Sequence, residues 1–171
     1  MDVGNLQTAL VTALADAGKT IAVAESCTGG MIASRITEVS GASSVFLCGV
    51  CAYSNQSKVD MLGVEPRVLE AHGAVSREVA LEMAKGIRRA SQADIGLATT
   101  GIAGPSGGTQ DKPVGLVYVA ISTQEREEVR ELNLGRGGID GEREHIRNAA
   151  CINAMHMVMA TIQMASERGA F

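Results

Sequence analysis

Apolar residues recur along the chain with two different spacings, and the alternation between them predicts helices that alternate with strands. A leucine stands at every fourth position from residue 6 to residue 14, which predicts a helix over residues 6–17 that ends at Gly18. The apolar run over residues 20–24 predicts the first strand. The rest of the chain continues in the same way.

Five more helices and four more strands are expected from these patterns. The helices are predicted over residues 30–38, 55–62 and 66–71, from residue 77 onward, and over residues 140–167. The strands are predicted over residues 44–53, 95–99, 114–122 and 129–134, with a loop at residues 40–43. Ser76 and Asp140 are suited to cap the two longer helices that follow them.

The order of these elements predicts an α/β fold, a three-layer α/β/α sandwich on a mixed, mostly parallel five-stranded sheet. Polar residues 123–128 join the last two strands as a C-terminal hairpin, and a long last helix follows. That helix is apolar on more than one stripe, so it should be buried on both sides, under the sheet or against a second subunit. We expect one domain over residues 1–171 and a homodimer or larger homo-oligomer.

Composition and charge narrow the possible partners. Apolar residues make up 46% of the 171 residues and aromatic residues only 2%, so the core must consist of aliphatic side chains and methionine. The net charge is −4, and no block of Lys and Arg alternates with aromatic residues, so nucleic acid is not an expected partner. No basic leader precedes an apolar segment and no apolar run approaches about 18 residues, so we expect no membrane partner and a cytoplasmic location.

The cysteines and histidines do not predict a metal site. Cys48 and Cys51 form a C-x-x-C pattern inside a segment that reads as a buried strand, where positions three apart face opposite sides. Two small core residues explain this pattern better than a metal or redox pair. The histidines have no carboxylate or thiolate neighbours with metal-binding spacing, and we expect no metal.

The segment at residues 24–30 reads Ala-Glu-Ser-Cys-Thr-Gly-Gly and follows the first predicted strand. Ser26 thus stands where a strand ends and a Gly-Gly pair opens a helix. This position suits a nucleophile, because amide groups at the start of the helix can point toward an oxyanion formed there. The alternative is that Ser26 or Thr28 only caps the helix, and the G-x-S-x-G nucleophile pattern is absent.

A serine without a suitable histidine needs another base, and Lys58 is the candidate. It falls in the first turn of the helix after the second strand, where the helix dipole disfavours an ammonium group and so favours a neutral amine. Tyr53, at the end of that strand, could relay a proton or hold the base. The alternative is a solvated lysine and a half-buried tyrosine.

Two further features suggest an anionic ligand. The loop over residues 100–109 is rich in glycine and follows a predicted strand, which leaves amide groups free to hold an anion. It lacks the Gly-Lys-Ser/Thr of a nucleotide triphosphatase loop. Arg143 and Arg147 lie four residues apart on the last helix, and a phosphate group would explain both.

Taken together, these segments resemble the CinA carboxy-terminal domain family, the nicotinamide mononucleotide amidohydrolases. The matching motifs are the segment at 24–30, Tyr-Ser-Asn at 53–55 with Lys58, Gly-Ala-Val-Ser at 73–76, Thr-Gly-Ile-Ala-Gly-Pro at 100–105, and Lys-Pro-Val-Gly at 112–115. The match runs from about residue 5 to residue 165. Two departures are Cys-Gly-Val-Cys at 48–51 in place of Gly-Gly-Val-Val, and a looser segment at 137–139.

The resemblance implies hydrolysis of the carboxamide of nicotinamide mononucleotide to nicotinic acid mononucleotide and ammonia, without metal or other cofactor. Ser26 would attack the amide carbon, and Lys58 would accept its proton with help from Tyr53. Amides near residues 28–30 are the candidate oxyanion hole. The residues expected to bind substrate are Glu25, Thr28, Gly29, Gly30, Asn55, Thr100, Gly101, Ala103, Gly104 and Arg143.

Two other functions remain open from the sequence. One is a noncatalytic module that binds a phosphoribosyl ligand or a partner, as the name of a competence- and damage-inducible family suggests. Such a module would need the loop and the arginines but not Ser26, Tyr53 and Lys58 together. The other is a thiol enzyme that uses Cys27, which would be inactivated by thiol reagents.

Overall fold

The computed structural model describes residues 3–138 and 142–167, with side chains from Leu6 onward. Its elements in chain order are α1 (Val3–Asp16), β1 (Ile21–Glu25), α2 (Met31–Thr37), the 3-10 helix η1 (Ala42–Ser44), β2 (Phe46–Cys51), α3 (Asn55–Leu62), α4 (Pro66–His72), α5 (Arg77–Ser91), β3 (Ile95–Gly101), β4 (Leu116–Ser122), β5 (Glu127–Asn133) and α6 (Glu142–Glu167).

The predicted elements are present, with small shifts at their ends. The loop predicted at residues 40–43 is wrong in part, because a 3-10 helix forms there over Ala42–Ser44. Ser76 caps α5 as predicted, since its Oγ accepts the amide proton of Val79 at 3.3 Å. The cap predicted at Asp140 lies outside the described residues.

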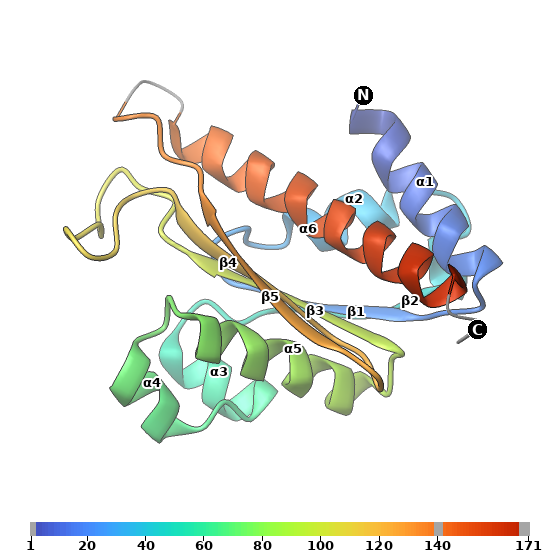
Figure 1. The fold of residues 1–171 in the computed structure, drawn as a ribbon, viewed down its shortest axis with the longest axis horizontal. Coiled ribbons are helices and arrows are strands. Elements are labelled where there is room, and N and C mark those ends of the chain that lie inside the picture. Colours follow the sequence, from blue (N-terminus) through green and yellow to red (C-terminus); the bar gives the residue numbers. More distant parts are fainter. Residues whose placement is uncertain (1–2, 139–141, 168–171) are drawn as a thin grey trace.

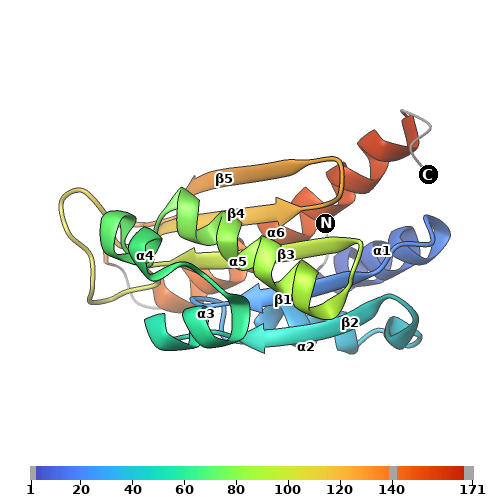
Figure 2. The same cartoon turned by 90° about the horizontal axis from the view of Figure 1, so that it is seen from below.

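The strands form one mixed sheet in the order β2-β1-β3-β4-β5. Strand β1 pairs in parallel with β2 and with β3, whereas β3–β4 and β4–β5 are antiparallel. Only β4 therefore runs against the other strands. The C-terminal hairpin is formed by β4 and β5, and Figure 2 shows the whole order from the side of α3, α4 and α5.

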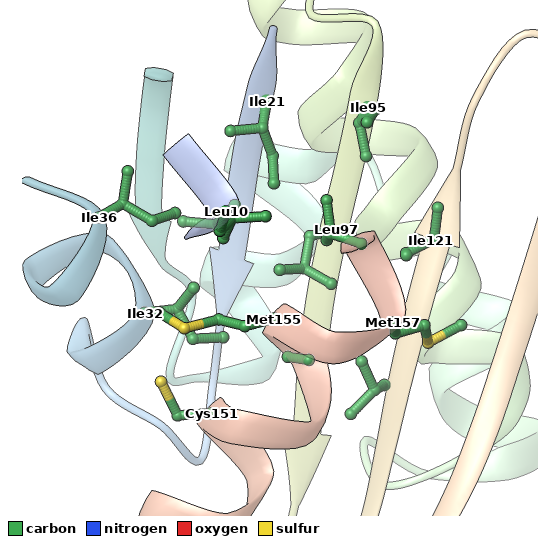
Figure 3. Packing of buried hydrophobic residues seen from close by; sticks show 14 of the residues in the cluster. Leu10, Ile21, Ile32, Ile36, Ile95, Leu97, Ile121, Cys151, Met155 and Met157 are labelled. Carbon is green, nitrogen blue, oxygen red and sulfur yellow. The ribbon is translucent and has the colours of Figure 1, made fainter. Parts of the chain in front are cut away.

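Helices cover both faces of this sheet, which confirms the three-layer α/β/α sandwich (Figure 1). Helices α1, α2 and α6 lie on one face and α3, α4 and α5 on the other. Each face has its own aliphatic core. Leu10, Ile32, Leu97 and Met155 meet on the first face (Figure 3), and Met83 belongs to the core on the second.

One apolar stripe of α6 is buried within this chain, and the other is buried in part. Ile146, Ala150 and Met157 of the first stripe are fully buried. On the second stripe Met155 and Ile162 are buried, whereas Ile152 and Met159 are half-buried. The helix packs against α1 and α2 as well as against β3 and β4. The sheet and the neighbouring helices thus cover the first stripe and part of the second, and the homo-oligomer stays a prediction.

Strand β2 lies at an edge of the sheet, so the expectation of a buried strand over residues 44–53 is wrong. Its residues alternate between half-buried and exposed positions, and Cys51 is exposed rather than part of the core. Cys48 is half-buried on the other face, so the two thiols do point to opposite sides. An apolar composition alone does not distinguish an edge strand from a central one.

Helix α5 approaches both α3 and the sheet more closely than side chains would permit. A Cβ atom on Gly86 would lie 1.9 Å from the carbonyl oxygen of Leu62, at the end of α3. A Cβ atom on Gly96 in β3 would lie 2.1 Å from the carbonyl oxygen of Ala84. Main chain therefore contacts main chain at both places.

Among the residues that the structure describes, no helix is long and apolar enough to cross a membrane.

We expect Gly86→Ala to lower the free energy of unfolding by about 2 kcal/mol or more, although alanine favours a helix by about 1 kcal/mol over glycine. The reason is the clash with Leu62, whose carbonyl is main chain and cannot rotate away. Ala90→Gly, at an exposed position of α5, measures the difference in helix propensity between alanine and glycine alone in the same helix. Urea unfolding would decide, and a stabilised Gly86→Ala variant would contradict this packing.

Candidate active site

The predicted site residues gather at the carboxyl ends of the three parallel strands. The chain leaves β1 through α2 on one face to reach β2, and leaves β2 through helices on the other face to reach β3. This reversal falls between the carboxyl ends of β1 and β3, which is the usual position of the ligand site in such sheets. Ser26 stands there, directly after β1, and its amide donates to the carbonyl of Thr99 in β3 at 3.0 Å.

Lys58 reaches from α3 to the end of β1 and contacts Ser26. Helix α3 starts at Asn55 because Ser54 caps it, with its Oγ accepting the amide proton of Ser57 at 3.0 Å. The Lys58 side chain is only 1% exposed, and its Nζ lies 3.1 Å from Ser26 Oγ. The structure thus brings the predicted nucleophile and base within hydrogen-bond distance.

Two main-chain carbonyls orient the Lys58 amine. Nζ donates to the carbonyl of Ala52 at 2.9 Å and to that of Tyr53 at 3.4 Å. A neutral amine has two N–H groups and one lone pair, so these carbonyls take both protons and the lone pair is left for the Ser26 hydroxyl. This arrangement is the one a general base requires.

Burial also favours the neutral form of this amine. Removal from water lowers the pKa of Lys58 below its ordinary value, although the neighbouring Cys27 acts in the opposite direction. Burial raises the pKa of the Cys27 thiol to about 12, so that sulfur is uncharged near neutral pH. No carboxylate forms an ion pair with Lys58 among the described residues.

The same observations weigh against Cys27 as the nucleophile. Its side chain is 6% exposed, and a thiol with so high a pKa supplies very little thiolate at neutral pH. Ser26, which is 9% exposed, has the amine beside it instead. The geometry therefore favours the serine over the thiol.

Glu25 holds the start of α2. Its carboxylate accepts amide protons from Gly30 at 3.0 Å, Ile32 at 3.1 Å and Ala33 at 2.9 Å, and the side chain is 1% exposed. A carboxylate at a helix N-terminus is favoured by both the free amides and the helix dipole. Glu25 was expected to bind substrate, but the structure uses its oxygens to fix the segment that contains Ser26.

These hydrogen bonds reduce the number of amides that could form the oxyanion hole. The amide of Gly30 donates to Glu25, and the amide of Ser26 donates to Thr99. Of the three predicted positions, Gly29 remains for an oxyanion, because the backbone of Thr28 is hydrogen-bonded to the Cys27 thiol. Gly29 has a φ of 61° and is exposed beside Ser26, whereas Thr28 is buried, with its hydroxyl 2.7 Å from that of Thr99.

Tyr53 and Asn55 lie where the chain passes from β2 into α3. The Tyr53 ring is 63% exposed, and its hydroxyl lies 3.3 Å from Nη2 of Arg143, away from Lys58. The structure therefore places the carbonyl of Tyr53, and not its phenol, on the base. Asn55 is exposed in the first turn of α3.

The residues expected from the glycine-rich loop differ in what they contact. The Thr100 hydroxyl donates to the carbonyl of Ala74 at 2.8 Å and is buried. Gly101 has no room for a Cβ atom, which would lie 2.7 Å from the Leu116 carbonyl. Ala103 belongs to the core, with 5% exposure. These three residues shape the base of the loop in this structure.

Two arginines of α6 contact this end of the sheet from its other face. Arg143 Nη1 donates to the carbonyl of Gly104 at 2.5 Å, which links α6 to the glycine-rich loop. Arg147 Nη2 donates to the carbonyl of Thr28 at 2.8 Å, which links α6 to the segment after Ser26. Both guanidinium groups thus stand at the site, and an anionic group placed between them would meet positive charge from each.

Sequence reasoning missed several contacts that are made by main chain or by distant residues. The carbonyl of Ala52 gives no signal in the sequence. Lys112 appeared only within a matching motif, yet its Nζ donates to the carbonyls of His72 at 2.6 Å and Val75 at 2.8 Å. It thereby fastens the glycine-rich loop to the segment between α4 and α5. Across the described residues, no group of three or more His, Cys, Asp or Glu side chains could hold a metal ion.

Comparisons with known proteins agree with the fold. The model of the CinA C-terminal domain family matches residues 4–162. A competence-damage inducible protein of Acetivibrio thermocellus is 54% identical over 145 residues, which are 85% of this chain and 34% of that protein. The chain spans about a third of the length of the curated relatives it matches.

Solved structures show the same fold. The competence/damage inducible protein CihA of Agrobacterium tumefaciens has a TM-score of 0.88 at 41% identity, with 94% of this chain and 95% of that chain covered. A competence or damage-inducible protein of Enterobacter asburiae has a TM-score of 0.86 at 31% identity, with 95% and 99% covered.

The wild-type protein should gain stability relative to Lys58→Met as the pH rises from 7 to 10. The folded state binds the Lys58 proton less tightly than the unfolded chain does, so stability increases between the lowered pKa and the ordinary value of 10.5. Urea unfolding at several pH values measures this difference. Ser26→Ala keeps the buried amine and should keep the slope, and parallel pH profiles for wild type and Lys58→Met would contradict a lowered pKa.

Glu25→Gln should lower the free energy of unfolding by about 1–3 kcal/mol, because three charge-assisted hydrogen bonds at the start of α2 lose their anion. Glu70→Gln removes an exposed carboxylate of α4 and serves as the matched control. Chemical unfolding of both variants tests the cap, and equal effects would show that Glu25 does not hold the helix.

Proposed function

The chain belongs to the CinA C-terminal domain family, and on this premise we propose that it is a serine amidohydrolase that acts on nicotinamide mononucleotide. The single observation that carries the proposal is the pair formed by Ser26 Oγ and the buried Lys58 amine at 3.1 Å. A binding module has no need to bury an amine beside a hydroxyl without a carboxylate partner, because burial of such a group costs stability. Catalysis by a Ser–Lys pair does need it.

The pair can carry both halves of an amide hydrolysis. Ser26 Oγ forms a bond to the carboxamide carbon while Lys58 Nζ takes the hydroxyl proton. The tetrahedral adduct then collapses, the carbon–nitrogen bond breaks, and the Lys58 ammonium returns the proton to the departing nitrogen. Ammonia leaves, and an ester on Ser26 remains.

Water completes the reaction on the same groups. Lys58 Nζ accepts a proton from the attacking water, the ester carbon–oxygen bond breaks, and the proton passes back to Ser26 Oγ. The product is nicotinic acid mononucleotide, and no electron transfer is involved. The amide of Gly29 would face the oxyanion in both adducts, because the amides of Ser26, Thr28 and Gly30 already have acceptors.

The arginines support a substrate with a phosphate group. Arg143 and Arg147 stand one helical turn apart and donate to carbonyls of the glycine-rich loop and of the segment after Ser26. A phosphate would offer them charged acceptors in place of neutral carbonyls, which makes stronger hydrogen bonds. The homo-oligomer, the cytoplasmic location and the absence of a metal requirement stay predictions.

The purified protein should release ammonia from nicotinamide mononucleotide in the presence of a chelator, and Ser26→Ala or Lys58→Ala should lower kcat by about 10³-fold or more. Because Lys58 acts as a neutral base with a lowered pKa, kcat/KM should rise with pH and level off below the ordinary lysine value of 10.5. Ser34→Ala, an exposed serine of α2, is the matched control.

Two outcomes would contradict the proposal. Substrate binding without ammonia release from folded wild-type protein would favour the noncatalytic module. Loss of activity in Cys27→Ala, with activity retained in Ser26→Ala, would instead identify a thiol enzyme.

A further inference from the structure

A cavity lies at the opposite end of the sheet from Ser26. It has a volume of about 590 Å³ and is bordered by the last turns of α5, the start of β3, the turn between β4 and β5, and the last turns of α6. Figure 1 shows the β4–β5 turn beside the end of α5, and the glycine-rich loop at the other end of the strands. No residue predicted for the active site lines this cavity. Its size is that of a small-molecule site.

Most charges on the cavity wall are paired. Lys19 Nζ lies 3.8 Å from the Asp94 carboxylate, and Lys85 Nζ lies 2.9 Å from that of Glu127. Thr20 also donates to Asp94 through its amide and its hydroxyl. These groups therefore bring little net charge to a ligand.

The remaining charges on the wall are mainly positive. Arg126 pairs with Glu128 at 2.5 Å, and Glu125 lies in the exposed β4–β5 turn. Arg88 and Arg89 line the cavity, and neither forms an ion pair with a carboxylate of the described residues. Arg89 is exposed and reaches toward Gly63, where a Cβ atom would lie 3.0 Å from its Nη2. Arg88 is thus the cation that the structure leaves for the cavity.

Arg88 is held in place along its length. Its Cβ atom lies against Gly96 of β3, where an added methyl group would come within 2.7 Å. Its Nε donates to Ser122 Oγ at 3.2 Å, and Ser122 is fully buried at the end of β4. One edge of the guanidinium group is therefore fixed to the sheet, and the terminal Nη donors are left for another acceptor. A preorganised guanidinium is suited to a carboxylate or phosphate.

A general explanation exists for positive charge at this place, because cations stabilise the last turn of a helix. That explanation applies equally to Arg88 and Arg89, which both stand in the last turn of α5. It does not account for the bond from Arg88 to a buried serine or for the cavity beside it. The two arginines therefore provide a comparison between a dipole effect and a binding site.

We propose that this cavity binds a small organic anion, with a carboxylate or phosphate group accepting hydrogen bonds from the Nη atoms of Arg88. The site is independent of the proposed amidohydrolase activity. Its ligand would occupy the amino end of β3, while the active site lies beyond the carboxyl end. A bound anion would link α5, the β4–β5 hairpin and α6 at that end of the molecule.

The test is a titration of the isotope-labelled full chain with sodium phosphate and, separately, with sodium succinate at constant ionic strength, followed by amide chemical shifts. We expect saturable shifts at Ala93, Asp94 and Thr123 with at least one of the two anions, and the anion that binds identifies the preferred group. Shifts near Gly29 would report binding at the other end and are counted separately. A series with sodium chloride alone gives the response to salt.

Arg88→Gln should weaken binding at least about tenfold, because the ligand loses its charge-assisted hydrogen bonds. Arg89→Gln removes the same charge from the same helical turn and should change the affinity less than about threefold. Arg88→Lys keeps the charge without the forked donors and should also weaken binding. Absence of saturable shifts with both anions, or equal effects of Arg88→Gln and Arg89→Gln, would overturn the proposal.

Discussion

The burial of the Lys58 amine without a carboxylate partner is the constraint around which the site is organised. An amine that is removed from water needs hydrogen-bond acceptors or loses its proton. The Lys58 amine has two carbonyl acceptors, and its burial favours the neutral form. The chain supplies two carbonyls directly after β2, and β1 supplies the hydroxyl of Ser26. Parallel pairing of β1 with β2 brings these ends together, so the sheet topology and the chemistry of the site depend on each other.

Glu25, the residue before Ser26, carries the opposite charge, and main-chain groups stabilise it too. Three amides at the start of α2 donate hydrogen bonds to its carboxylate, in place of a cationic side chain. Main-chain dipoles thus stabilise both the Glu25 carboxylate and the Lys58 amine, and the two side chains do not form an ion pair with each other. Such compensation keeps Glu25 and Lys58 as separate groups, which leaves the amine free to exchange a proton with Ser26.

The sequence predicted the order of elements, the hairpin and the meeting of Ser26 with Lys58, because apolar periodicity and strand ends carry that information. It did not predict that β2 lies at an edge, since Phe46–Cys51 is as apolar as a central strand. It also assigned Glu25 to substrate, and gave the Tyr53 phenol a role near the base. Both assignments depend on where side chains point after the chain has turned, which neither spacing nor residue type determines.

The close approach at Gly86 has a consequence for how this domain tolerates change. Leu62, whose carbonyl meets α5 there, ends the same short helix that carries Lys58 one turn earlier. At this contact the position of α3 against α5 is therefore set by backbone resting on backbone. A methylene-sized substitution in either core costs stability, whereas at Gly86 even a single methyl group forces the two helices apart.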